Sequence, residues 1–94
     1  MNQGQEDILF EVETPLGFTV RTTVEYWDYI STIKHPIMRG READVRETLA
    51  NPNEVHVSKN DPHVYLFYRN DGEKRWICGV TKKMNGDGFL ITAY

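Results

Sequence analysis

The second half of this chain decides its fold and reads VYLFYRNDGEKRWICGVTKKMNGDGFLITAY from Val64 to Tyr94. Apolar and aromatic runs alternate there with Asn-, Asp- and Gly-rich turns, whose residues tolerate a left-handed backbone. Connections this short join antiparallel neighbours, because a parallel crossover needs about a dozen residues or more. The pattern predicts four antiparallel strands, over residues 54–58, 64–69, 75–82 and 88–94.

The first half predicts a hairpin followed by two helices. Residues 8–13 and 16–21 are strand-like and flank a turn at Pro15-Leu16-Gly17. Thr22-x-x-Glu25 is a capping-box pattern that predicts the start of a helix. The expected apolar stripe of this helix consists of Tyr26, Tyr29, Ile30 and Ile33. Pro36 ends the helix and places His35 at its C-terminal end, and a second helix is expected over residues 42–50.

We therefore expect an α+β fold with an N-terminal β-hairpin, two helices and then a four-stranded antiparallel sheet with the helices on one face. The length of 94 residues suits one domain, over residues 8–94, with a disordered polar N-terminus at residues 1–7. The single cysteine cannot form an internal disulfide, and no apolar run approaches the roughly 20 residues that cross a bilayer. The sequence thus predicts a cytoplasmic protein that does not contact membranes.

Composition and motif spacing exclude several kinds of site. The formal net charge is −3, which is not the basic balance typical of a protein whose whole surface binds nucleic acid. No two of the three histidines and the single cysteine have the close spacing of a zinc-ligand pair. No glycine-rich phosphate loop precedes a helix. We therefore expect neither a metal nor a cofactor.

Two segments carry candidate chemistry. The stretch from Lys34 to Arg41 is free of acidic residues, and three interpretations of it stay open: cations beside a helix C-terminus, a solvated loop, or a histidine flanked by phosphate-binding arginines. In the last strand, alternation puts Thr92 and Tyr94 on one face, which is either solvated or a ligand surface. The same alternation predicts that Phe89, Ile91 and Ala93 pack against the helices and that Leu90 joins Thr92 and Tyr94.

Five segments together carry a resemblance to a known family: residues 18–36, 41–45, 51–55, 65–69 and 88–94. Their most specific pieces are His35-Pro36 before a charged helix, Asn51-Pro52-Asn53-Glu54-Val55, and the closing Thr92-Ala93-Tyr94. The chain resembles the phage-type barnase–EndoU–colicin–RelE-like (BECR) nucleases, which are small toxin or effector ribonuclease domains. Members of this family usually continue beyond this strand with a proline, so the resemblance predicts that the chain is trimmed at Tyr94.

The resemblance implies a metal-independent ribonuclease. In such a reaction the ribose 2′-hydroxyl attacks the adjacent phosphorus and leaves a 2′,3′-cyclic phosphate. By the resemblance, His35 and Thr92 are the catalytic candidates, and the candidates for holding the phosphate are Arg39, Arg41, Lys59 and Arg69. Tyr94 is a further substrate-binding candidate, because its phenol can donate to phosphate or sugar and its ring can stack on a base. The expected partners are RNA and a neutralising antitoxin or immunity protein. The alternative is a catalytically inactive nuclease-fold module that binds a partner.

Overall fold

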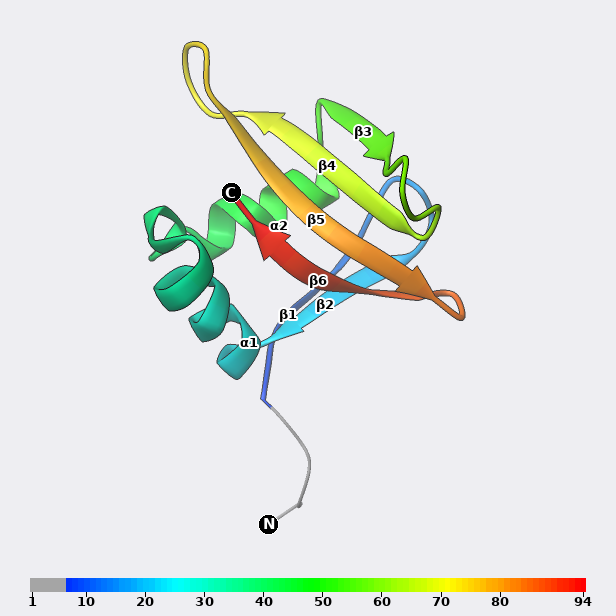
Figure 1. The fold of residues 1–94 in the computed structure, drawn as a ribbon, viewed down its shortest axis with the longest axis horizontal. Coiled ribbons are helices and arrows are strands. Elements are labelled where there is room, and N and C mark those ends of the chain that lie inside the picture. The colour runs from blue at the N-terminus through cyan, green and yellow to red at the C-terminus, as the bar shows by residue number, and fades with distance from the viewer. Residues whose placement is uncertain (1–6) are drawn as a thin grey trace.

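The computed structural model describes residues 7–94, so the predicted disorder of residues 1–7 lies outside the described residues except at Asp7. Two strands are followed by helical segments and then by four more strands (Figure 1). In chain order the elements are β1 (Ile8–Glu13), β2 (Thr19–Thr23), α1 (Val24–Tyr29), the π-helical η1 (Ile30–Lys34), the 3-10 helix η2 (Pro36–Met38), α2 (Glu42–Ala50), β3 (Glu54–Val57), β4 (Val64–Asn70), β5 (Trp76–Met84) and β6 (Asp87–Ala93). No helix within residues 7–94 is long and apolar enough to span a membrane.

The α+β class is confirmed, but the sheet has six strands and is mixed. Its order is β1-β2-β6-β5-β4-β3, and the pairing of β2 with β6 is parallel. The predicted four-stranded antiparallel sheet is therefore wrong in extent, because the N-terminal hairpin joins it through β2. Short turns exclude parallel pairing between consecutive strands, but β2 and β6 are connected through both helices and three strands. That long connection permits a parallel neighbour.

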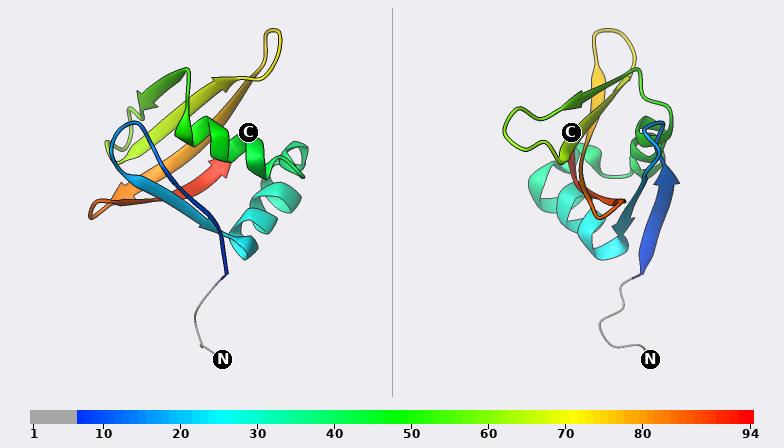
Figure 2. Two further views of the ribbon diagram at one scale, coloured as in Figure 1. Left: turned by 180° about the vertical axis from the view of Figure 1, so that it is seen from behind. Right: turned by 90° about the vertical axis from the view of Figure 1, so that its right-hand side faces the viewer.

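Helix α2 covers one face of β4 and β5. It lies behind these strands in Figure 1 and in front of them in the reversed view of Figure 2. Its buried residues Val45, Thr48 and Leu49 belong to the side that faces the core. Gly79 on β5 permits this close approach, since an added Cβ there would lie 3.0 Å from Leu49 Cδ2. The face of the sheet that carries Gly79 is called the covered face below.

The first helix differs from the prediction at both of its ends. Thr23 is the N-cap, one residue later than predicted, and its hydroxyl accepts a hydrogen bond from the Tyr26 backbone N–H at 3.0 Å. Trp27 and Ile30 are buried, whereas Ile33 is 66% exposed. The backbone widens to a π-helix at Ile30. Because a π turn closes between residues five apart, the residues after it rotate away from the 3.6-residue stripe.

The expected alternation of the last strand is wrong at residues 89–91, because β6 contains a β-bulge there. Thr92 pairs with Val80 and Leu90 pairs with Thr81, so Ile91 is the extra residue. The phenolic O–H of Tyr26 donates to the carbonyl of Ile91 at 2.7 Å. The exposed fractions of Leu90, Ala93 and Phe89 are 1%, 0% and 42%, respectively. Leu90, not Phe89 or Ile91, therefore packs into the core next to the helices.

Candidate functional site

The register of the sheet assembles a second face opposite α2, which we call the open face. Paired residues of antiparallel strands project to the same side. Tyr68 pairs with Glu54 and Cys78, and Cys78 exchanges two backbone hydrogen bonds with Tyr94, at 2.7 and 3.0 Å. Glu54, Tyr68, Cys78 and Tyr94 thus form one row across the sheet. The neighbouring row consists of His56, Leu66, Val80 and Thr92. The open face includes Glu54, His56, Leu66, Tyr68, Trp76, Cys78, Val80, Thr92 and Tyr94.

His35 reaches this face from the end of η1. Its backbone N–H donates to Ile30 O at 2.7 Å and closes the π turn. Pro36 disfavours a helical backbone at the preceding residue, and His35 accordingly has φ −143° and ψ 80°. The helix therefore stops where the imidazole lies beside β6, with ring centroids of His35 and Tyr94 5.6 Å apart. Two candidates separated by most of the chain are thus neighbours.

The side chain of Tyr94 interacts with the side chains of Cys78 and Tyr68. Hydrogen bonding to the Cys78 side chain, together with burial, raises the pKa of Tyr94 well above its ordinary value. Burial likewise raises the pKa of the Cys78 thiol, which is 1% exposed, and burial also raises the pKa of Tyr68. All three groups are therefore protonated at neutral pH. Tyr94 remains 45% exposed, and its ring lies beside the His35 ring.

Thr92 lies on the open face, one row from Tyr94. Its hydroxyl oxygen is buried and has no hydrogen-bond partner among the described residues. A buried polar group without a partner destabilises a folded protein by roughly 1–3 kcal/mol. Such groups call for a specific explanation, for example a ligand that supplies the missing bond.

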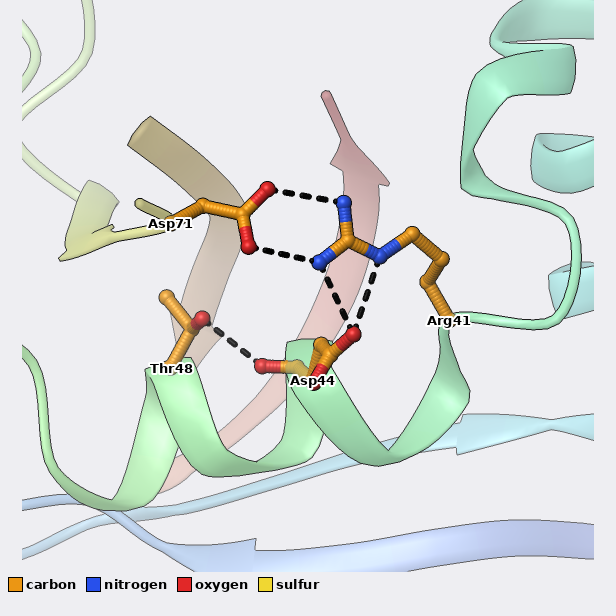
Figure 3. Close-up of polar contacts among 4 residues, drawn as sticks. All are labelled: Arg41, Asp44, Thr48 and Asp71. Atoms are coloured by element: carbon orange, nitrogen blue, oxygen red, sulfur yellow. Dashed lines mark hydrogen bonds and ion pairs between the residues drawn. The ribbon is translucent and has the colours of Figure 1, made fainter. Parts of the chain in front are cut away.

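Two of the basic candidates instead hold the covered side together. The Arg41 guanidinium makes two hydrogen bonds to the Asp71 carboxylate, at 2.8 and 2.9 Å, and a third to Asp44 at 2.9 Å (Figure 3). This network links the start of α2 to the turn between β4 and β5. Arg69 points to the α2 side, where it donates to the carbonyl of Asn51 and lies 3.9 Å from a carboxylate oxygen of Glu47.

The other two basic candidates are exposed loop residues. Arg39 follows η2, and Lys59 lies between β3 and β4. Neither makes an ion pair with another residue in the range 7–94. They are therefore the basic candidates whose charges are unpaired within this range.

Beyond the predicted residues, the open face carries a hollow lined by Glu54, His56, Tyr68 and Trp76. Neither motif spacing nor alternation within one strand could identify it, because its members come from three strands. The signal that could have found it is the pairing register, which places Tyr68 opposite Glu54. Residues 7–94 contain no cluster of three or more His, Cys, Asp or Glu side chains that could hold a metal ion.

Comparison of the chain with protein-family models, with curated proteins and with solved structures gives no match. A functional assignment therefore depends on the residues of the open face.

Proposed function

We propose that this protein is a metal-independent endoribonuclease whose reactive centre is formed by His35 and Tyr94. The observation that carries the proposal is the contact of these two rings, 5.6 Å apart, at the C-terminal end of β6, on a sheet face that no α-helix within residues 7–94 covers. The resemblance to BECR nucleases implies the same histidine. Around this centre, the open face carries exposed aromatic side chains of the kind that stack on unpaired bases.

The proposed chemistry uses the histidine as a base. An imidazole exchanges protons near neutral pH, so His35 can accept the proton of a ribose 2′-hydroxyl. As the 2′-oxygen bonds to phosphorus, the bond to the 5′-oxygen breaks and that oxygen needs a proton. Tyr94 presents the neighbouring O–H, and a phenol is a stronger acid than the alcohol that forms. Tyr94 is protonated at neutral pH, and its raised pKa makes it a weaker proton donor than an ordinary phenol.

Binding of the reacting phosphate is assigned to Arg39 and to Thr92. Arg39 can offer planar, paired donors to phosphate oxygens, whereas Arg41 and Arg69 are engaged on the covered side. Thr92 keeps the role that the resemblance implies, as a hydroxyl on the reacting phosphate. Its buried oxygen would then gain its first partner when a substrate moves the neighbouring side chains aside.

The test is cleavage of an unstructured RNA oligonucleotide in the presence of EDTA, with detection of 2′,3′-cyclic phosphate ends. We expect His35→Ala to reduce the rate by roughly 10²–10⁴ without unfolding the protein. His63→Ala is the matched control, because His63 is an exposed loop histidine whose removal should leave the rate unchanged. Unchanged cleavage by folded His35→Ala would overturn the assignment. Absence of cleavage by the wild-type chain would favour the inactive binding module.

A further inference from the structure

A pocket of about 250 Å³ lies where β2 and β6 separate, and its lining includes Ile8, Arg21, Thr22, Tyr26, Phe89 and Leu90. The last pair of the parallel ladder is Arg21 with Phe89, and β2 then leads into α1 (Figure 1). The pocket therefore lies between the diverging strands and the start of this helix. Phe89 is five residues from Tyr94, or roughly 15 Å along an extended strand, so the pocket is separate from the reactive centre.

The buried end of the pocket contains a hydroxyl without a partner. Thr22 is 4% exposed, and its Oγ1 has no hydrogen-bond partner among the described residues. The other buried threonine and serine side chains of residues 7–94 each donate to a backbone carbonyl; they are Thr14, Ser31, Thr48 and Thr81. A buried hydroxyl without a hydrogen bond is destabilising, so Thr22 calls for a specific explanation.

Apolar and aromatic side chains form the walls of the pocket. Ile8 and Phe89 are about half exposed, although both are large apolar side chains, whereas Leu90 is buried. The phenolic O–H of Tyr26 already donates to the carbonyl of Ile91, so this proton is not available to a ligand. The walls therefore offer apolar contact and two aromatic rings to whatever enters.

Arg21 is the charged residue of the lining. Its guanidinium lies 3.8 Å from a carboxylate oxygen of Glu11, which is longer than a hydrogen bond, and about half of each side chain is exposed. Within residues 7–94, this is the one ion pair that Arg21 makes. Its donors are therefore available at the entrance of the pocket for an anionic group such as a carboxylate.

We propose that this pocket binds a small hydroxyaryl carboxylate, whose carboxylate pairs with Arg21 and whose hydroxyl group reaches Thr22. Such a ligand has the same order of groups as the pocket: a charge at the entrance, an apolar ring along the walls and a hydroxyl at the buried end. A cavity of about 150 Å³ holds benzene, so about 250 Å³ accommodates one ring with two small polar groups. The half-exposed side chains of Ile8 and Phe89 move apart to admit the ring.

The test is a titration of the isotope-labelled chain with para-hydroxyphenylacetate, followed by the amide signals in NMR spectra. We expect the largest shifts at residues 21–23 and 89–90. Phenylacetate lacks the hydroxyl and should bind about 3–10-fold more weakly, which is the effect of one neutral hydrogen bond. Para-hydroxyphenylethanol lacks the carboxylate and should bind about tenfold more weakly, because it forms no ion pair with Arg21.

Two variants connect each polar group of the ligand with one side chain. Thr22→Val should bind para-hydroxyphenylacetate and phenylacetate equally, and its Tm should not fall, because no hydrogen bond within the chain is lost. Arg21→Gln should bind para-hydroxyphenylacetate and para-hydroxyphenylethanol equally. Arg75→Gln is the matched control and should retain both preferences, since Arg75 is exposed and precedes β5, outside the pocket.

Equal binding of para-hydroxyphenylacetate and phenylacetate by the wild-type chain would overturn the inference, as would unchanged preferences in the two variants. Shifts confined to residues outside the pocket would also overturn it, because the ligand would then bind elsewhere. An absence of shifts at millimolar ligand would do the same. These measurements involve no RNA, so their outcome is independent of whether the chain is a ribonuclease.

Discussion

Replacing either of two adjacent residues in β6 tests which face of the strand is buried. Leu90→Ala and Ile91→Ala each remove three carbon atoms, so the lost surface differs through burial rather than size. Leu90 is 1% exposed and belongs to the core cluster, whereas Ile91 is the partly exposed residue of the bulge. Three buried carbons at about 0.8 kcal/mol each give about 2.4 kcal/mol for Leu90. The cavity term then brings the loss to roughly 3–5 kcal/mol.

The loss for Ile91→Ala should be about 1 kcal/mol, because part of this side chain is already in water. Urea unfolding followed by circular dichroism measures both free energies of unfolding. In thermal unfolding, Leu90→Ala should lower Tm by roughly 12–40 °C and Ile91→Ala by about 4–8 °C. If Ile91→Ala costs as much stability as Leu90→Ala, alternation continues through β6 without a bulge. Thr92 and Tyr94 would keep their place opposite Ile91, so this outcome would refute the bulge alone.

Two further predictions concern charge. The Arg41 guanidinium holds the pKa of Asp71 below its ordinary value, so the stabilisation from this pair is present at neutral pH and is lost as the pH falls below the ordinary value of about 3.9. The stability difference between wild type and Asp71→Asn should therefore shrink in acid, and a difference that grows as the pH falls would contradict the pairing. If Arg39 and Lys59 are the two phosphate contacts, log K for single-stranded RNA should fall with log salt at a slope near −1.4. A fluorescence titration at several salt concentrations measures this slope, and a value near zero would exclude phosphate contact.

The sequence predicted those parts of the fold that depend on neighbours along the chain. Turn residues separate β4, β5 and β6, and the helix at Glu42–Ala50 has its two buried aliphatic residues one turn apart. Features that depend on distant partners were not predictable in the same way. The pairing of β2 with β6 brings together residues 68 positions apart in the chain. The bulge at Ile91 shifts the pattern of a single strand, and such a shift is visible only from the pairing with β5.

In the candidate site, too, local sequence patterns predicted some features, whereas others depend on contacts between distant parts of the chain. Pro36 indicated where the first helix ends and so placed His35 at the C-terminal end of that helix. Its contact with Tyr94 depends on how η1 packs beside β6, which no local pattern expresses. The basic candidates were the hardest to place, since an arginine can satisfy a carboxylate of its own chain as well as a phosphate. Asp71 lies 30 residues from Arg41, and nothing in the spacing of the two predicts their contact.

The distribution of charge and aromatic surface explains how an acidic chain could bind RNA. Arg41 and Arg69 are used to fasten α2 to the sheet, so the covered side takes two of the cations that the resemblance assigned to phosphate. The open face instead offers Tyr68, Trp76 and Tyr94, and stacking on such rings contributes roughly 1–3 kcal/mol per base without requiring positive charge. Bases can reach these rings only when they are unpaired. On the proposed function, this surface therefore selects single-stranded RNA through its bases, while Arg39, four residues from His35 in the chain, positions the reacting phosphate.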